Sequence, residues 1–233
     1  MPHSLLDRQV LIAVADHSVQ MSPDASYAIT GGTGALGLQV ARWLVQRGAG
    51  HVALLSRSGQ VAKGAEEHWE WLQQCSAQVK VWRCDVADKE AVGRTLQEIH
   101  EAAPMRGVVH AAGVLADGML EKQTEEKLRK VWGPKVDGAL HVHGAVVELG
   151  CELDHLVLFS SVASLLGSAG QGNYAAANAA LDGLAVQWRR EGLPAVSIQW
   201  GAWAGGGMAT ESGAERRLHA VGMRGIEHDE AAL

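Results

Sequence analysis

A tyrosine, a serine and an asparagine are spaced in a way that suits proton transfer to a substrate oxygen. Tyr174 and Asn178 are four residues apart in a helical pattern, so both side chains lie on one helix face. Ser161 comes earlier, at the end of Ser160-Ser161, which follows the apolar run Leu156–Phe159. A phenol that donates a proton to a developing alkoxide, beside a serine that holds the oxygen, is suited to carbonyl reduction. A buried core tyrosine with a satisfied hydroxyl is the alternative for Tyr174.

A lysine is the candidate cation for this tyrosine. The pKa of an unperturbed phenol is about 10, which is too high for easy proton exchange, so a nearby cation is expected to lower it. Lys135, within Trp132–Gly138, can supply that charge. For a lone lysine, solvent exposure is the alternative, and the lysine taken by itself favours that interpretation.

A glycine-rich segment follows the apolar run Tyr27–Thr30 and precedes an amphipathic helical pattern. Gly32, Gly34 and Gly37 match G-x-G-x-x-G between a strand and a helix, where backbone amides can approach a pyrophosphate. A purely structural glycine turn is the alternative. The residues expected to bind a dinucleotide here are Gly31, Gly32, Thr33, Gly34, Ala35, Leu36 and Gly37.

The second strand indicates which dinucleotide binds. An NAD-binding protein places an acidic residue about 20 positions after the glycines, to hold the ribose hydroxyls. Here the strand ends in Ser56-Arg57-Ser58, and a guanidinium flanked by hydroxyls suits the 2′-phosphate of NADPH. An ordinary solvated arginine is the alternative for Arg57.

Two later strand ends add candidate contacts. Asp85 can meet the adenine amino group while Asp88 caps the next helix, and small residues after His110 leave room for a ribose. A packed histidine is the favoured interpretation of His110. The additional cofactor contacts expected here are Asp85, Val86, Ala111, Ala112 and Gly113.

Apolar runs alternate with helical patterns along the chain. Strands are expected at Ser26–Thr30, His51–Ser56, Lys80–Cys84, Gly107–Ala111, His155–Ser160 and Ala195–Gln199. Helices are expected at Gly37–Arg47, Ala65–Gln74, Lys89–Ala102, Thr124–Leu149 and Tyr174–Glu191. Short apolar strands separated by helices predict an α/β fold, with a doubly wound parallel sheet in three α/β/α layers, the Rossmann fold.

The chain divides into two expected regions. Residues 1–25 are interpreted as a linker or edge segment, and residues 26–233 as one dinucleotide-binding unit. Ala204–Leu233 begins with a glycine-rich stretch, expected to be a mobile lid, and ends in a helical pattern that has barely begun. We therefore expect a domain truncated at its C-terminus.

Composition excludes several classes of function. The chain is 47% hydrophobic and 20% charged with a net charge of −6, which favours neither nucleic acid nor an anionic membrane as a partner. No apolar run is long enough to span a bilayer, and no secretory signal is evident. The three cysteines form no disulfide or zinc pattern, so a reducing, cytoplasmic setting is expected. His141 and His143 lack i, i+4 spacing and a third ligand, so no metal site is predicted.

These residues together resemble the short-chain dehydrogenase/reductase superfamily. Most members place lysine four positions after the tyrosine; here Asn178 takes that place and Lys135 lies upstream. This swap resembles ketoreductase domains of modular polyketide synthases and of animal-type fatty acid synthases. The stretches that carry the resemblance are Ile29–Gly37, Ser56–Gly59, Cys84–Asp88, Gly107–Gly118, Phe159–Asp182 and Ser197–Met208.

The resemblance implies a function and a set of partners. Ser161, Tyr174, Lys135 and Asn178 would be the catalytic set, with Lys135 and Tyr174 also contacting NADPH. The substrate would be a 3-ketoacyl thioester on acyl carrier protein, reduced to a 3-hydroxyacyl thioester. Relatives carry a preceding structural subdomain without a cofactor, for which residues 1–25 are too short, so an exposed apolar docking face is expected. Other synthase domains are the further partners implied.

The family patterns also extend to the substrate side. Leu115-Ala116-Asp117 keeps the last acid of a Leu-Asp-Asp pattern that is typical of ketoreductases giving a D-hydroxy product, and Asn173 resembles the same type. Trp203 and Met208 resemble the substrate-side loop and lid, which would close over the substrate.

Two other functions remain open. One is a non-catalytic NADP-binding structural module of a larger synthase, against which the four intact catalytic residues argue. The other is a free-standing reductase of small ketones or sugars, which the swapped lysine and asparagine disfavour.

Overall fold

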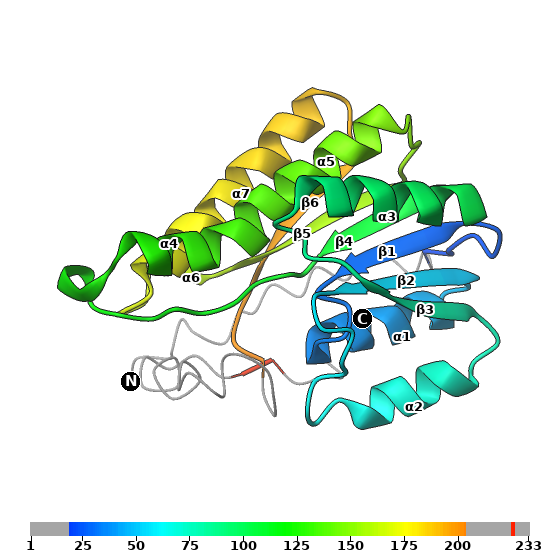
Figure 1. The fold of residues 1–233 in the computed structure, drawn as a ribbon, viewed down its shortest axis with the longest axis horizontal. Coiled ribbons are helices and arrows are strands. Elements are labelled where there is room, and N and C mark those ends of the chain that lie inside the picture. The colour runs from blue at the N-terminus through cyan, green and yellow to red at the C-terminus, as the bar shows by residue number, and fades with distance from the viewer. Residues whose placement is uncertain (1–18, 204–224, 227–233) are drawn as a thin grey trace, which may run out of the picture.

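A single parallel sheet organises the protein, whose structure is a computed structural model that describes residues 19–203 and 225–226. The strand order is β3-β2-β1-β4-β5-β6 (Figure 1). The strands are β1 (Ser26–Thr30), β2 (His51–Ser56), β3 (Gln78–Arg83), β4 (Met105–His110), β5 (His155–Ser161) and β6 (Ala195–Trp200). Each expected strand is present with its ends within two residues of the prediction. The Rossmann fold is confirmed.

Burial explains why the strands could be predicted from the sequence. The central strand β1 is buried at every position, whereas the edge strand β3 alternates between exposed and half-buried residues. The strand order reverses between β1 and β4, and in such sheets ligands bind in the crevice that opens there, outside the carboxyl ends of the strands. The glycine-rich segment follows β1 at this switch point.

Helices cover both faces of the sheet. Figure 1 shows α1 and α2 on one face and α3, α5 and α7 on the other. Each face has its own apolar core. The helices are α1 (Ala35–Gln46), α2 (Glu66–Gln74), α3 (Lys89–Ala102), α4 (Glu125–Trp132), α5 (Gly138–Glu148), α6 (Ala163–Leu166) and α7 (Gly172–Arg190). The predicted N-cap of α3 is confirmed, because the Asp88 side chain accepts from the Ala91 amide at 3.0 Å.

The helix expected over Thr124–Leu149 is present over Glu125–Glu148, but it is not α-helical throughout. The segment comprises α4, a π-helical turn η2 (Gly133–Asp137) and α5. Pro134 lies at the start of this turn and has no amide hydrogen, so it cannot continue the regular i→i−4 ladder. The sequence also missed α6 and the short 3₁₀ turn η1 (Leu120–Lys122).

The described part of the expected linker packs on the domain. Met21 and Ala25 are buried, and the Met21 amide donates to the carbonyl of Arg47 at 2.8 Å. The boundary at residue 25 stays a prediction. The expected lid and C-terminal helix, apart from residues 225 and 226, lie outside the described residues.

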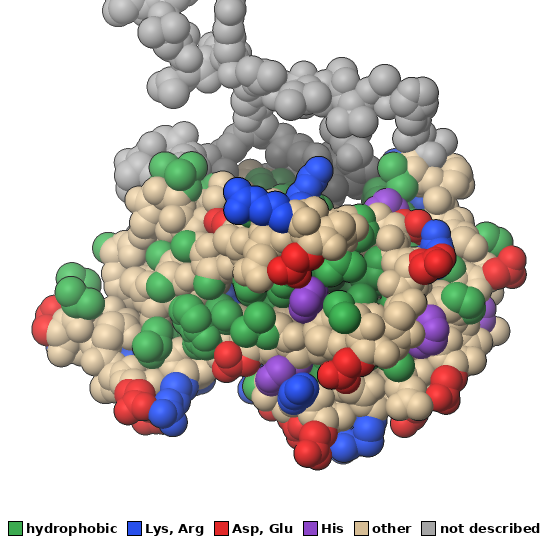
Figure 2. Space-filling model, turned by 90° about the horizontal axis from the view of Figure 1, so that it is seen from above, with side chains coloured by type: hydrophobic (Ala, Val, Ile, Leu, Met, Phe, Trp, Pro, Cys, Tyr) green, Lys and Arg blue, Asp and Glu red, His purple; other side chains and the backbone are tan. Residues whose placement is uncertain are grey.

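The surface carries charges of both signs. Figure 2 shows acidic and basic side chains scattered over the face seen from above, with apolar side chains between them. Leu140 and Val147 of α5 and Val186 of α7 are among the exposed apolar residues. A docking face for a preceding subdomain stays a prediction. Of the helices that the structure describes, none has both the length and the apolar character needed to cross a bilayer.

Candidate active site

The glycine-rich loop has a backbone that larger residues could not adopt. Gly31 has a φ of +67°, in the left-handed region that favours glycine. A Cβ atom on Gly32 would lie 2.7 Å from the Cα atom of Leu54, and one on Gly37 would lie 2.5 Å from the Gly31 carbonyl oxygen. Gly34 is the N-cap of α1 and offers no capping side chain, so the first amides of α1 remain available to an anion.

A cavity of about 600 Å³ opens beside this loop. It is lined by Gly31, Thr33, Gly34, Ala35, Leu36, Gly37, Leu55, Ser56, Arg57, Ser58, Cys84, Val86, Ala111, Ala112, Gly113, Val114 and Pro134. Most of the predicted cofactor contacts are therefore gathered around one space. The glycine backbone and a helix N-terminus at its wall fit a pyrophosphate. Gly32, Asp85, Lys135 and Tyr174 are not among the lining residues.

Two of the remaining predicted contacts serve the local structure. Gly32 packs behind the loop against Leu54. Asp85 is exposed, and its Oδ1 atom accepts from the Ala87 amide at 3.0 Å, while its neighbours Cys84 and Val86 line the cavity.

Hydrogen bonds connect the end of β2 to the glycine-rich loop. The Thr33 hydroxyl donates to Ser56 Oγ at 2.8 Å, and Ser56 Oγ also accepts from the Gly59 amide at 3.3 Å. Arg57 is exposed at the cavity wall, so its guanidinium is accessible to an anion there.

Lys135 is buried, so the solvent-exposed alternative for this residue is wrong. Lys135 belongs to the π-helical turn η2, and its buried Nζ atom donates to the Phe159 carbonyl oxygen at 2.8 Å. Nζ lies 5.4 Å from the centre of the Tyr174 ring. Burial lowers the pKa of Lys135 to about 7, against a smaller opposing effect of Asp182.

Tyr174 and Asn178 lie one turn apart on α7, as the sequence predicts. Burial raises the pKa of the Tyr174 hydroxyl, and the nearby Asp117 carboxylate raises it further, while hydrogen bonding to Asn178 and Ser161 lowers it. Burial outweighs these hydrogen bonds, so the lowered phenol pKa expected from the sequence is not found in this structure.

Ser161 ends β5 beside this tyrosine. Its hydroxyl accepts from the Ala163 amide at 3.2 Å, which orients it at the start of α6. Asn178 is fully buried, and its Nδ2 atom donates to the Tyr174 carbonyl oxygen at 2.8 Å. Within the described residues, Asn178 Oδ1 is a buried acceptor with no hydrogen-bond partner. The predicted catalytic residues thus converge from β5, α7 and the turn η2.

Hydrogen bonds connect the loop after β4 to the start of α7. Gln171 Nε2 donates to both carboxylate oxygens of Asp117, at 3.3 and 3.1 Å. Asn173 Nδ2 donates to the Ala116 carbonyl oxygen at 2.9 Å, and its Oδ1 accepts from the Tyr174 amide at 2.8 Å. Sequence reasoning identified Asp117 and Asn173 but missed Gln171, whose partner is distant in the chain.

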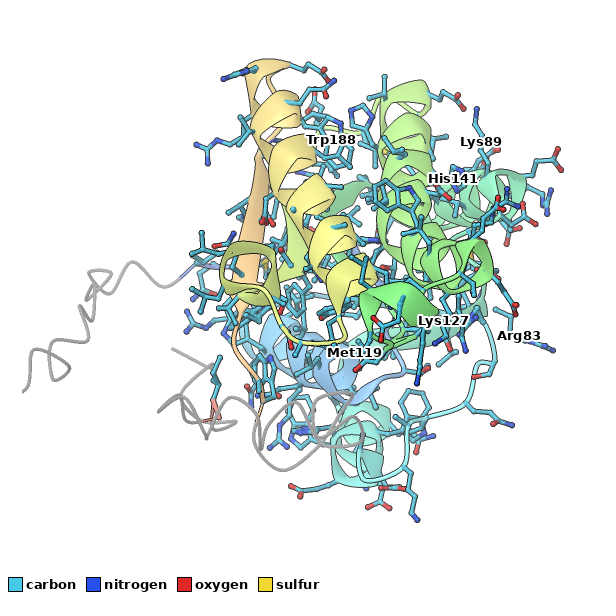
Figure 3. All side chains as sticks on the ribbon, turned by 90° about the vertical axis from the view of Figure 1, so that its left-hand side faces the viewer. Arg83, Lys89, Met119, Lys127, His141 and Trp188 are labelled. Atoms are coloured by element: carbon cyan, nitrogen blue, oxygen red, sulfur yellow. The ribbon has the colours of Figure 1, made fainter. Side chains whose placement is uncertain are left out.

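Leu115 and Trp203 are the other predicted substrate-side residues that the structure describes. Leu115 is half-buried in the loop after β4, and Trp203 is buried with its ring 5.0 Å from that of Trp200. Figure 3 shows Met119 and Lys127 beside the end of α7 that carries Tyr174, opposite the end that carries Trp188. Met208 lies outside the described residues.

Asp182 also contributes to the site, and sequence reasoning did not single it out. Its carboxylate accepts from Ser197 at 2.6 Å, from Ser164 at 2.7 Å and from Gln199 at 2.8 Å. These contacts join α7 to α6 and β6. They hold the pKa of Asp182 below its usual value despite partial burial.

The histidines set aside at the sequence level have structural roles. His110 is fully buried, which confirms the prediction of a packed histidine. His141 Nδ1 lies 2.9 Å from the Val86 carbonyl oxygen, and His143 stacks on Trp188 with ring centres 4.4 Å apart. Within the described ranges, no three histidine, cysteine or acidic residues form a group that could hold a metal ion.

Comparisons with known proteins agree with this geometry. The KR domain family model matches residues 25–205. Polyketide synthase GfsA of Streptomyces halstedii is 45% identical over 221 residues, which cover 95% of this chain and 3% of that protein. Spectinabilin polyketide synthase system protein NorB of Streptomyces orinoci is 47% identical over 190 residues, covering 80% of this chain and 9% of that protein.

Solved structures give the same result. An A1-type ketoreductase matches with a TM-score of 0.82 and 42% identity, over 89% of this chain and 43% of that one. The first ketoreductase of the tylosin PKS matches with a TM-score of 0.76 and 42% identity, over 91% of this chain and 45% of that one. This chain thus spans less than half of these solved chains and a small part of the curated relatives.

Proposed function

The chain belongs to the KR domain family of polyketide synthases, and from that membership we propose that it reduces a 3-ketoacyl thioester on acyl carrier protein to a 3-hydroxyacyl thioester with NADPH. The observation that carries the proposal is the convergence of Lys135, Tyr174 and Ser161 next to the cavity at the β1–β4 switch point.

Each residue has a defined task in this proposal. The Tyr174 hydroxyl donates the proton to the developing alkoxide, and the Ser161 hydroxyl holds that oxygen. The Lys135 ammonium, near the Tyr174 ring, stabilises the phenolate that forms when the proton leaves. Asn178 fixes the turn of α7 that carries Tyr174, through its bond to the Tyr174 carbonyl oxygen.

NADPH is the cofactor that the cavity residues suit. Bound there, it supplies the hydride. The glycine loop and the N-terminus of α1 would hold the pyrophosphate, while Ser56 and Arg57 at the end of β2 would hold the 2′-phosphate. Ala111, Ala112 and Gly113 would leave space for the ribose.

The test is NADPH oxidation with a 3-ketoacyl thioester analogue, comparing the wild type with Tyr174→Phe. We expect kcat to fall at least about 100-fold in the variant, since the proton donor is lost, while the Kd for NADPH stays within about threefold. Equal rates would reject the catalytic proposal and favour a non-catalytic NADP-binding module. Activity on small ketones but not on thioesters would favour a free-standing reductase.

The product of the same assay tests stereochemistry. We propose a D-hydroxy product from the resemblance of Asp117 and Asn173 to residues typical of that type. Chiral chromatography of the hydroxyacyl product measures the ratio of enantiomers, and an excess of the L-hydroxy product would overturn this assignment.

A further inference from the structure

His110 connects the nucleotide-binding strand with the lysine of the active site. It is the last residue of β4 and pairs in register with Thr30, the last residue of β1. Its Nδ1 atom lies 2.8 Å from the Thr30 hydroxyl, and its Nε2 atom lies 2.9 Å from the carbonyl oxygen of Lys135. The ring is fully buried, so water does not compete for either nitrogen.

The direction of every hydrogen bond in this chain follows from chemistry. The Lys135 carbonyl oxygen can only accept, so Nε2 of His110 carries the hydrogen. Burial lowers the pKa of His110 to about 4, so near neutral pH the ring is uncharged and Nδ1 is an acceptor. The Thr30 hydroxyl therefore donates to Nδ1. It accepts in turn from the Ala112 amide at 3.2 Å.

The chain runs from the cavity wall to the catalytic lysine. Ala112 lines the cavity, and Thr30 directly precedes the glycine loop. Lys135 is thereby held at two points, by His110 at its carbonyl oxygen and by Phe159 at its amine.

The turn that carries Lys135 is in contact with the His110 ring. It is π-helical, so the regular hydrogen-bond ladder does not define its position alone. The ring also packs closely against it, because a Cβ atom on Gly138 would lie 3.1 Å from His110 Cε1. A neutral imidazole can donate to the turn without placing a second positive charge beside Lys135.

We propose that His110 is a positioning residue that fixes Lys135 relative to Tyr174 by donating a hydrogen bond from Nε2 to the Lys135 carbonyl oxygen. It does not line the cavity, and it acts through Lys135 rather than on the substrate. This inference rests on the proposed reductase function.

Two substitutions test the two ring nitrogens of His110 separately, because each keeps only one of the two hydrogen-bonding groups. The amide nitrogen of Gln can approximate the position of Nε2, so His110→Gln keeps a donor for the Lys135 carbonyl oxygen. The amide oxygen of Asn can approximate Nδ1, so His110→Asn keeps the acceptor for Thr30 and loses that donor. Thr30→Val is the matched control on the other side, since it removes the hydroxyl with little change of shape.

The expected results differ among these variants. For His110→Asn we expect kcat to fall at least about tenfold, with KM for the thioester and Kd for NADPH within about threefold of wild type. His110→Gln and Thr30→Val should each retain at least about one third of wild-type kcat. A His110→Asn protein with wild-type kcat, or one that loses no more than His110→Gln, would overturn the proposal.

A spectroscopic readout on the unliganded wild type does not depend on activity or on the folding of variants. Nitrogen-15 NMR of the His110 ring should report a neutral imidazole protonated at Nε2 from pH 5.5 to 8. An Nδ1-protonated or cationic ring at pH 6.5 would overturn the proposal. If the wild type does not oxidise NADPH with the thioester, the proposed function fails. The NMR result still shows whether Nε2 of His110 carries the hydrogen that it would donate to the Lys135 carbonyl oxygen.

Discussion

The Nζ atom of Lys135 lies 5.4 Å from the centre of the Tyr174 ring, although the two residues come from separate helical segments. Nζ is held there by the Phe159 carbonyl oxygen, at the carboxyl end of β5. A cation on the face of a tyrosine ring is favourable and stabilises negative charge on the phenol oxygen. The swapped order of lysine and asparagine in the sequence therefore still brings an amine to the tyrosine.

Replacing Lys135 with Met removes a buried amine whose pKa in the folded protein is about 7, against 10.5 for an unperturbed lysine. Between these values the unfolded chain binds more protons, so through this group the free energy of unfolding rises with pH. We expect Lys135→Met to be the more stable protein at pH 6. The wild type should gain on it by up to about 1.4 kcal/mol per pH unit from pH 7 to 10. Urea unfolding measures this difference.

Comparing the two proteins at each pH cancels groups that titrate in both. Burial raises the pKa of Cys84 and Cys151, and their ionisation also falls in the alkaline range. A stability difference that stays constant from pH 6 to 10 would contradict the buried, pKa-shifted amine.

Replacing Gly37 with Ala should disrupt the phosphate loop. The new Cβ atom would lie 2.5 Å from the Gly31 carbonyl oxygen and 2.7 Å from the Gly32 Cα atom, and backbone atoms cannot move aside as side chains do. We expect a loss of stability of about 2 kcal/mol or more and at least tenfold weaker NADPH binding. Fluorescence titration and thermal unfolding measure the two effects.

Gly93 provides the matched control for this change. It lies inside α3, and a Cβ atom there would meet nothing within 4 Å. Gly93→Ala should raise stability by about 0.5–1 kcal/mol because alanine favours the helix, and NADPH binding should not change. If both alanine variants bind NADPH like the wild type, the loop does not hold the pyrophosphate.

Replacing Arg57 with Ala should reduce discrimination between NADPH and NADH. Arg57 lines the cavity at the end of β2, and a charge-assisted contact with the 2′-phosphate is worth about 1.5–3 kcal/mol. We expect the Kd for NADPH to rise about 10- to 100-fold, with the Kd for NADH nearly unchanged. Arg94→Ala is the control, since Arg94 is an exposed residue paired with Glu90 on α3. Equal effects on both dinucleotides would reject the 2′-phosphate contact.

Replacing Asp182 with Asn should weaken the hydrogen bonds that join α7 to α6 and β6. Three donors point at this carboxylate, and an amide group presents its own hydrogens to one of them. We expect a loss of stability of about 1–3 kcal/mol and a lower kcat, measured by urea unfolding and by NADPH oxidation. Asp154→Asn, at the exposed ion pair with Arg106, should cost less than about 1 kcal/mol. Equal losses in the two variants would contradict this role for Asp182.

Most of the fold could be predicted because its signals are local. Each strand is a short apolar run, and the cap of α3 is a single aspartate before a helical pattern. The π-helical turn could not be predicted, because the pattern of apolar residues continues through Pro134. The pattern indicates one long helix, and the structure has that helix with a π-helical turn inside it.

The part of the site that could not be predicted depends on contacts between distant segments. Asp182 gains its role from Ser197 and Gln199 on β6, and Gln171 gains its role from Asp117. Their spacing along the chain does not show that these residues contact one another. The burial of Lys135, and with it the shift of its pKa, also depends on packing that spacing along the chain does not encode.

The π-helical turn at Gly133–Asp137 also sets the rotational phase of α5. A π turn accommodates one residue more than an α-helical turn does, so the chain beyond it is rotated by about 100° relative to an uninterrupted α-helix. If this turn became regular α-helix with all of its residues kept, Ala139, Val142 and Val146 would rotate away from the sheet that buries them. The irregular turn that presents Lys135 is thus also what keeps the apolar side of the following helix directed at the core.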